Sequence, residues 1–172
     1  MEWLRIKTTQ DIYYVSFIKL FRASFPIFEQ RTDAQFQQVM GDDRCHICVT
    51  LENKKVVGLV VYWLFKDYFY IEYLAIHPDE RGKLRGTQML SSLMLSISKN
   101  CILEIDPLCD EISKKRLKFY QGLGFETNSY VHTHPAYRRE YKDHKLIVLS
   151  SSPLSEKGYN QYYQDLSKVV MK

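Results

Sequence analysis

The sequence predicts an α/β domain, in which helices flank one β-sheet. Three observations carry this prediction: a strand hairpin over residues 45–65, a strand–loop–helix unit over residues 70–97, and further strand and helix patterns on both sides of these. In the hairpin, apolar and β-branched side chains fill Cys45–Glu52 and Lys55–Phe65, and the two-residue connection Asn53-Lys54 suits a tight turn. A chain of 172 residues is long enough to bury a sizeable core in a single domain.

The strand–loop–helix unit is the most informative stretch of the chain. Its strand, Tyr70–Ile76, is rich in aromatic and aliphatic side chains, and His77-Pro78 ends it because proline cannot donate to a sheet. A basic, glycine-containing loop, Arg81–Gly86, follows, and apolar residues then recur at helical spacing up to about Lys99. Such a loop directs backbone N–H groups and the positive end of a helix at one spot, which favours a phosphate. The glycine spacing fits neither the P-loop nor the dinucleotide-binding loop.

The first forty residues predict a strand and two helices. Trp3–Lys7 is the strand, and Thr8 with Asp11 form a capping box that opens a helix running to about Phe25. The apolar face of this helix is expected to consist of Ile12, Val15, Ile18, Leu20 and Phe21. Asp33 is expected to cap a second helix that ends near Met40.

The second half of the chain predicts three more strands and two helices. A strand covers Cys101–Asp106, and a helix from about Ser113 ends at Gly124, a residue suited to the left-handed C-cap. Strands around Phe125–His132 and Lys145–Ser150 complete the sheet. The segment 153–172 carries apolar residues on one helical face, which must be buried on the same domain or on a second copy; these are Tyr159, Tyr162, Tyr163, Leu166, Val169 and Val170.

Charge and composition narrow the classes of partner. A net charge of +4 fits an anionic ligand better than it argues for nucleic acid. The longest apolar run, Val56–Phe65, is too short to span a bilayer, and the absence of a secretory leader favours a cytoplasmic protein. Cys45 and Cys48 form a C-x-x-C pair, but three residues apart on a strand they point to opposite faces, so we expect reduced structural cysteines and no metal.

The loop resembles the pyrophosphate loop of the GNAT superfamily, the acyl-CoA-dependent N-acyltransferases. Arg81, Gly86 and the preceding Leu74–Pro78 match that family's [RQ]-x-x-G-x-[GA] loop, whereas Leu84 replaces its first glycine. A leucine forced to positive φ would cost roughly 1 kcal/mol. Lys118–Phe125 is similar to the family's [FL]-Y-x-x-x-G-F signature, and Glu104 lies in the fifth strand, where some members carry a glutamate.

The resemblance covers residues 1–152 and implies the GNAT fold, a mixed, mostly antiparallel sheet of about seven strands flanked by helices, with 153–172 as an added C-terminal helix. It also implies an N-acetyltransferase that moves the acetyl group of acetyl-CoA to a primary amine of a small molecule or peptide by direct attack in a ternary complex. The residues that it assigns to acetyl-CoA are Leu74, Ala75, Ile76, Arg81, Gly82, Lys83, Leu84, Arg85, Gly86, Thr87 and Ser113.

Three residues are candidates for the chemistry. Tyr120, in the [FL]-Y-x-x-x-G-F-like segment, is the candidate acid that protonates the departing thiolate. Glu104 and Glu72 are alternative candidates for the base that takes a proton from the acceptor ammonium, and the sequence does not choose between them. His132 and His134 share a strand face and could contact substrate, but two ligands do not make a metal site.

Two other functions stay open at this point. A catalytically idle acyl-CoA-binding or sensing module would share the fold, and only an assay of turnover separates it from an enzyme. A small nucleic-acid-binding protein would instead use the basic loops and tyrosines, and would bind DNA or RNA with a salt dependence and an affinity exceeding that for CoA. A homodimer is also compatible with the apolar face of the C-terminal segment.

Overall fold

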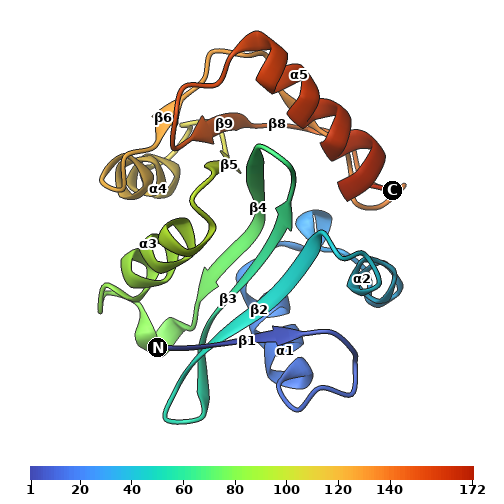
Figure 1. The fold of residues 1–172 in the computed structure, drawn as a ribbon, viewed down its shortest axis with the longest axis vertical. Helices are drawn as coiled ribbons and strands as arrows, with labels where there is room; N and C mark the ends of the chain where they lie inside the picture. Colours follow the sequence, from blue (N-terminus) through green and yellow to red (C-terminus); the bar gives the residue numbers. More distant parts are fainter. The chain divides into compact units, whose positions relative to one another are not determined.

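The computed structural model describes all residues, 1–172, and the chain forms two compact units, Met1–Lys99 and Asn100–Lys172. Figure 1 shows the elements of each unit in the order of the chain. The predicted division into a core of residues 1–152 and an extension of residues 153–172 concerns a different boundary, and it stays a prediction. No helix of the chain is both long and apolar enough to cross a membrane.

Four antiparallel strands form the centre of the first unit (Figure 1). Its strands are hydrogen-bonded in sequence order: β1 (Glu2–Ile6), β2 (Cys45–Glu52), β3 (Lys55–Leu64) and β4 (Tyr68–Ile76). The predicted hairpin is confirmed, because Asn53 and Lys54 have φ values of 49° and 62° and so make a two-residue turn with both residues left-handed. The strand before the loop begins at Tyr68, two residues earlier than predicted.

Helices cover both faces of this sheet. On one face, α1 (Tyr14–Ser24) packs Phe21 edge-on against Tyr73 of β4, with ring centroids 4.8 Å apart. On the other face, Met89 of α3 (Arg85–Ile97) packs against Gly58 of β3, where a Cβ would lie 3.0 Å from the Met89 sulfur. The faces are opposite because Tyr73 pairs with Val61, three residues from Gly58. The short helix α2 (Asp33–Met40) joins α1 through Phe36, 4.9 Å from Phe21.

The start of α1 differs from the prediction. The Asp11 carboxylate accepts hydrogen bonds from the backbone N–H groups of Lys7 and Thr8 at 2.6 and 2.9 Å, which stabilises a turn, and the helix begins only at Tyr14. Ile12 and Val15 therefore lie outside the buried face, with 85% and 60% of their surface exposed, and their assignment to the core was wrong.

The cap of α2 is also one residue away from the predicted position. Thr32 rather than Asp33 is the N-cap, because the Thr32 hydroxyl accepts from the N–H of Gln35 and the Gln35 side chain accepts from the N–H of Thr32. Asp33 is the first residue of the helix and pairs with Arg22 of α1 at 2.7 Å. A reciprocal capping box satisfies two N–H groups at once, which explains why it prevails over a single aspartate.

The second unit contains a three-stranded antiparallel sheet and a separate strand pair. In the sheet, β9 (Ile147–Ser150) lies between β5 (Asn100–Ile105) and β6 (Glu126–Thr127). The pair consists of β7 (Thr133–His134) and β8 (His144–Lys145). The predicted continuous strand Phe125–His132 was wrong, because β6 ends at Thr127 and the next strand, β7, begins only at Thr133.

Helix α4 (Glu111–Gln121) ends as the sequence predicts. Gly124 has φ +87°, and the N–H of Phe125 bonds the Tyr120 carbonyl at 3.1 Å, so the chain turns back and the Tyr120 and Phe125 rings pack 5.7 Å apart. The helix begins two residues before the predicted Ser113, because Asp110 is the N-cap and Ser113 completes its capping box.

The C-terminal segment folds as α5 (Glu156–Asp165), continued by a π-helical turn over Leu166–Val170. Tyr162, Leu166 and Val170, spaced four residues apart, are buried, whereas Tyr163 is 37% exposed. The predicted apolar face is thus confirmed in a narrower form. The Tyr130 ring stacks on Tyr159 of this helix at 4.2 Å, so α5 packs on its own unit.

Candidate functional site

The loop before α3 has the backbone expected of an anion site. Leu84 is left-handed, with φ 58° and ψ 13°, and its side chain is 71% exposed; Gly82 also has a positive φ of 76°. At the start of α3, the first backbone N–H group with a helical acceptor is that of Gln88, which donates to the Leu84 carbonyl at 3.0 Å. The N–H groups of Arg85, Gly86 and Thr87 therefore have no acceptor within the helix and point beyond its positive end.

Basic side chains of this loop are paired with acidic ones. Lys83 Nζ lies 3.1 Å from Glu80, and Arg85 contacts Glu52 and lies 3.5 Å from the other oxygen of Glu80. The hydrogen bond from Lys83 lowers the pKa of the Glu80 carboxyl. Arg81 Nε donates to the Ile76 carbonyl at 3.2 Å, at the end of β4. The charges assigned to the cofactor are thus partly neutralised within the loop itself.

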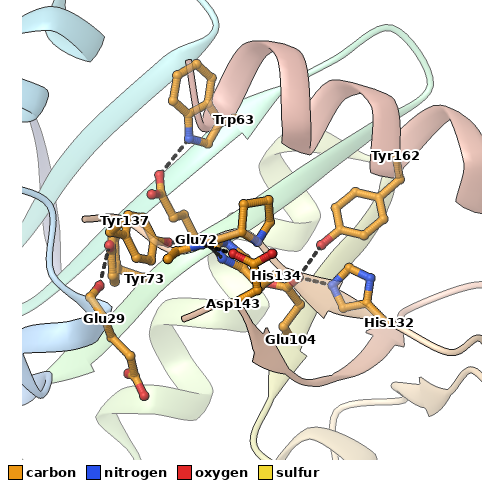
Figure 2. Close-up of polar contacts among 12 residues, drawn as sticks. Glu29, Trp63, Glu72, Tyr73, Glu104, His132, His134, Tyr137, Asp143 and Tyr162 are labelled. Atoms are coloured by element: carbon orange, nitrogen blue, oxygen red, sulfur yellow. Dashed lines mark hydrogen bonds and ion pairs between the residues drawn. The ribbon is translucent and has the colours of Figure 1, made fainter. Parts of the chain in front are cut away.

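Glu72, one of the two candidate bases, is held in a buried ion pair with Arg31, and Figure 2 shows its hydrogen bond to Trp63. Arg31 Nε donates to one carboxylate oxygen at 2.7 Å and Trp63 Nε1 donates to the other at 2.7 Å. The side chains of Arg31 and Glu72 are 1% and 0% exposed, and the guanidinium also lies 5.9 Å from the centroid of the Trp63 ring. Both oxygens of Glu72 therefore accept hydrogen bonds from donors that stay protonated in water at any ordinary pH.

Glu104, the other candidate, lies in a cluster of histidines and tyrosines within the second unit (Figure 2). His132 Nε2 and the Tyr162 hydroxyl both contact Oε1 of Glu104, the latter at 2.9 Å. His134 Nε2 lies 3.8 Å from Oε2. The Glu104 side chain is 5% exposed, so it is nearly as buried as Glu72.

The His134 side chain has a defined tautomer. Its Nδ1 lies 2.7 Å from the Pro135 carbonyl, which can only accept, so Nδ1 carries the hydrogen. Its Nε2 lies 3.4 Å from the Tyr137 hydroxyl, and its ring stacks on His144 at 5.8 Å. Burial, and then the nearby His134, lower the pKa of His144. No three His, Cys, Asp or Glu side chains of the chain are arranged to hold a metal ion.

Tyr120 and Ser113 lie on α4. Burial raises the pKa of Tyr120 to about 12. Its hydroxyl makes no hydrogen bond within the protein, and its ring packs on Phe119 and Phe125. Ser113 is buried, and its hydroxyl donates to the Asp110 carbonyl at 2.9 Å as part of the helix cap. The residue assigned to pantetheine thus has a structural role in this conformation.

The four cysteines are free thiols, and Cys45, Cys48 and Cys101 are buried. Burial raises the pKa of Cys48 to about 12, and it also raises the pKa values of Cys45 and Cys101. These three side chains therefore stay protonated thiols, which are poor nucleophiles and poor metal ligands.

The structure adds partners that the sequence did not indicate. Glu72 is paired with Arg31, from a distant segment, and with Trp63 of the neighbouring strand β3. Glu104 is paired with His132 and Tyr162, both from distant segments. One signal was present, since buried tyrosine hydroxyls need hydrogen-bond partners and the apolar face of the C-terminal helix contains three tyrosines.

A comparison with protein families adds independent information. The acetyltransferase (GNAT) domain family matches residues 43–127, which include β4, the Arg81–Thr87 loop, α3, Glu104 and Tyr120. No curated protein sequence matches the chain significantly.

Solved structures with the same fold are numerous. A GNAT-family protein from Bacteroides thetaiotaomicron superimposes with a TM-score of 0.92 at 23% identity, over 99% of this chain and 98% of that one. Arabidopsis thaliana Naa50, solved with the bisubstrate analogue CoA-Ac-MVNAL, gives a TM-score of 0.63 at 18% identity over 89% of this chain and 100% of its own. An aminoglycoside 6'-N-acetyltransferase solved with coenzyme A gives 0.63 at 15% identity, over 91% and 100%. The predicted fold class is thereby confirmed.

Proposed function

Because this chain belongs to the GNAT superfamily of acyltransferases, we propose that it moves the acetyl group of acetyl-CoA to a primary amine by direct attack in a ternary complex. The observation that carries this proposal is the left-handed Leu84 at the start of α3, within the segment that matches the family. Despite the missing glycine, the loop has the backbone that presents N–H groups to a pyrophosphate.

For the cofactor we propose the residues assigned from the sequence. The N–H groups of Gly82–Thr87 bind the pyrophosphate, and the backbone of Leu74–Ile76 holds the pantetheine. Arg81, Lys83 and Arg85 add charge, and Lys83 and Arg85 do so after exchanging their present carboxylate partners for phosphate oxygens. Ser113 contributes through the start of α4 rather than through its hydroxyl, which the helix cap already uses.

For the base we propose Glu104 rather than Glu72. A base must be able to gain and lose a proton during each turnover. Protonating Glu72 would break its pairing with a buried guanidinium, whereas Glu104 contacts a histidine and a tyrosine, which can exchange hydrogens with it.

For the acid we propose Tyr120. Its hydroxyl has no partner within the protein and its pKa is about 12, so the phenol is protonated and able to donate to the departing thiolate. The acceptor is the amine of a small molecule or of a peptide. The buried free thiols fit the reducing conditions of the cytoplasm, where we place the protein.

Binding of acetyl-CoA is tested by thermal unfolding. At a ligand concentration one hundred times the dissociation constant, the gain of about 2.7 kcal/mol raises the melting temperature of a protein of this size by about 5–10 °C. Replacing Arg81 and Lys83 by Glu should remove at least half of this shift. The matched control replaces Lys7 and Lys19 by Glu, since both are exposed and Lys19 lies on α1, across the sheet from α3.

Transfer is tested with a panel of primary amines and several acyl-CoA donors, by measuring free thiol. Acetyl-CoA-dependent thiol release that requires an amine supports the enzyme. A melting shift without any transfer would identify the idle binding module. No shift at millimolar acetyl-CoA would contradict the proposed function altogether.

A further inference from the structure

Helix α5 carries polar groups into the Glu104 cluster, although its sequence pattern predicted only an apolar face. The Tyr162 hydroxyl donates to Oε1 of Glu104 at 2.9 Å, and the Tyr162 side chain is buried. The Tyr159 hydroxyl lies 3.1 Å from Nδ1 of His132, whose Nε2 contacts the same Oε1. Two residues of α5 thus reach one carboxylate, directly and through a histidine.

The His132 ring is fixed on all sides within this unit. The rings of Tyr159, Tyr162 and Tyr163 surround it, with centroids 5.9, 5.8 and 5.8 Å away. Its two nitrogens face Tyr159 and Glu104. Since both Tyr162 and His132 bring hydrogens to Oε1, the carboxylate cannot rotate without losing two hydrogen bonds.

The Tyr159 hydroxyl can hydrogen-bond to His132 whether the imidazole is charged or neutral. It lies 3.2 Å from the Val131 carbonyl and 3.1 Å from His132 Nδ1. When its hydrogen points to Val131, its oxygen accepts a hydrogen from Nδ1 of a charged imidazolium. When the hydrogen turns to Nδ1, the imidazole is neutral and still donates through Nε2 to Glu104. No hydrogen bond of the ring is lost in either state.

We propose that His132, Tyr159 and Tyr162 are positioning residues for Glu104, so that the C-terminal helix α5 is part of the catalytic machinery. This inference rests on the proposed function, in which Glu104 takes the proton that leaves the acceptor ammonium. The nitrogen–hydrogen bond of the ammonium breaks, the hydrogen goes to the carboxylate through water, and the nitrogen lone pair becomes available for the thioester carbon. The two donors on Oε1 hold the carboxylate in one orientation for this step.

Single substitutions test the positioning role in the full-length protein. We expect Tyr162→Phe to lower kcat about 10-fold and His132→Gln about 100-fold, with an unchanged KM for acetyl-CoA and an unchanged acetyl-CoA melting shift. Tyr159→Phe should lower kcat about threefold, because it acts through His132. Gln164→Ala is the matched control, since this exposed residue lies on the same helix outside the cluster; it should stay within about twofold of the unmodified enzyme.

Full turnover in both Tyr162→Phe and His132→Gln would overturn this inference.

A spectroscopic measurement requires no acceptor. In nuclear magnetic resonance spectra, the Nε2–H hydrogen of His132 should resonate far downfield, and Glu104→Gln should move it upfield because a neutral amide is a weaker acceptor. Absence of that resonance at low temperature would contradict the contact. An unmodified protein that transfers nothing would overturn the proposed function, whereas an active enzyme indifferent to Tyr162→Phe would overturn only the role of α5.

Discussion

Glu72 on β4 of the first unit and Glu104 on β5 of the second are both buried carboxylates, with side chains 0% and 5% exposed. Their surroundings differ in the kind of hydrogen-bond donor. Glu72 accepts from an arginine and an indole, whereas Glu104 accepts from a tyrosine hydroxyl and contacts a histidine. The comparison teaches that burial alone does not identify a base. A permanent cation fixes a carboxylate as an anion, while titratable partners allow a proton to come and go.

The largest effect is expected from Glu72→Gln. It removes the charge that pairs with the buried Arg31 guanidinium, which should lower the free energy of unfolding by about 3–5 kcal/mol. Denaturant unfolding followed by circular dichroism measures this loss. The double replacement Arg31→Met with Glu72→Leu removes both charges and should recover most of the stability. If Glu72→Gln is as stable as the unmodified protein but inactive, the assignment of the two carboxylates must be reversed.

Glu104→Gln should give the opposite pattern. The amide oxygen can still accept from Tyr162 and His132, so the melting temperature should change little. Turnover should fall by about 100- to 1,000-fold, the usual scale for one positioned base. The loss should shrink at alkaline pH, where free amine is present without help from a base. A steady-state assay across pH measures both, and a loss equal at all pH values would argue against Glu104 as the base.

Tyr120→Phe sharpens the comparison with a third buried group, one whose hydroxyl has no protein partner. Turnover should fall by about 100-fold, with unchanged affinity for acetyl-CoA because the ring still packs on Phe125. Burial raises the pKa of Tyr120 to about 12, so the phenol should stay protonated up to about pH 10. Deprotonation of Tyr120 should therefore not reduce the activity of the unmodified enzyme in that range. Retention of full turnover in Tyr120→Phe would reduce this residue to a packing role.

The smallest effect is expected from a substitution of Leu84, because backbone N–H groups rather than side chains form the proposed pyrophosphate site there. Leu84→Gly relieves about 1–2 kcal/mol of left-handed strain. It also increases the conformational entropy of the unfolded chain, which lowers the stability by about 0.5–1 kcal/mol. The stability should therefore change by less than about 1 kcal/mol, and the affinity for acetyl-CoA by less than about threefold. Calorimetric titration measures the affinity. A gain of tenfold or more would show that the leucine distorts the loop in the unmodified protein.

Local sequence determined most of the secondary structure. The Asn53-Lys54 turn, the left-handed Gly124 and the strand–loop–helix unit around Leu84 all depend on residues adjacent in the chain, and the structure confirms each of them. Family-like motifs that span a few residues were also sufficient to predict the fold class. Errors occurred where two local signals competed, as with Thr32 and Asp33 at the start of α2.

Tertiary structure alone decided the environment of each candidate residue. From the sequence, Glu72 and Glu104 were equivalent acids on strands, and the tyrosines of 153–172 were only an apolar face. Their partners lie far along the chain: Arg31 is 41 residues from Glu72, and Tyr162 is 58 residues from Glu104. Periodicity and short motifs report on neighbours within a few residues, whereas the ability of a buried carboxylate to exchange a proton depends on which distant donors the packed chain brings to its oxygens.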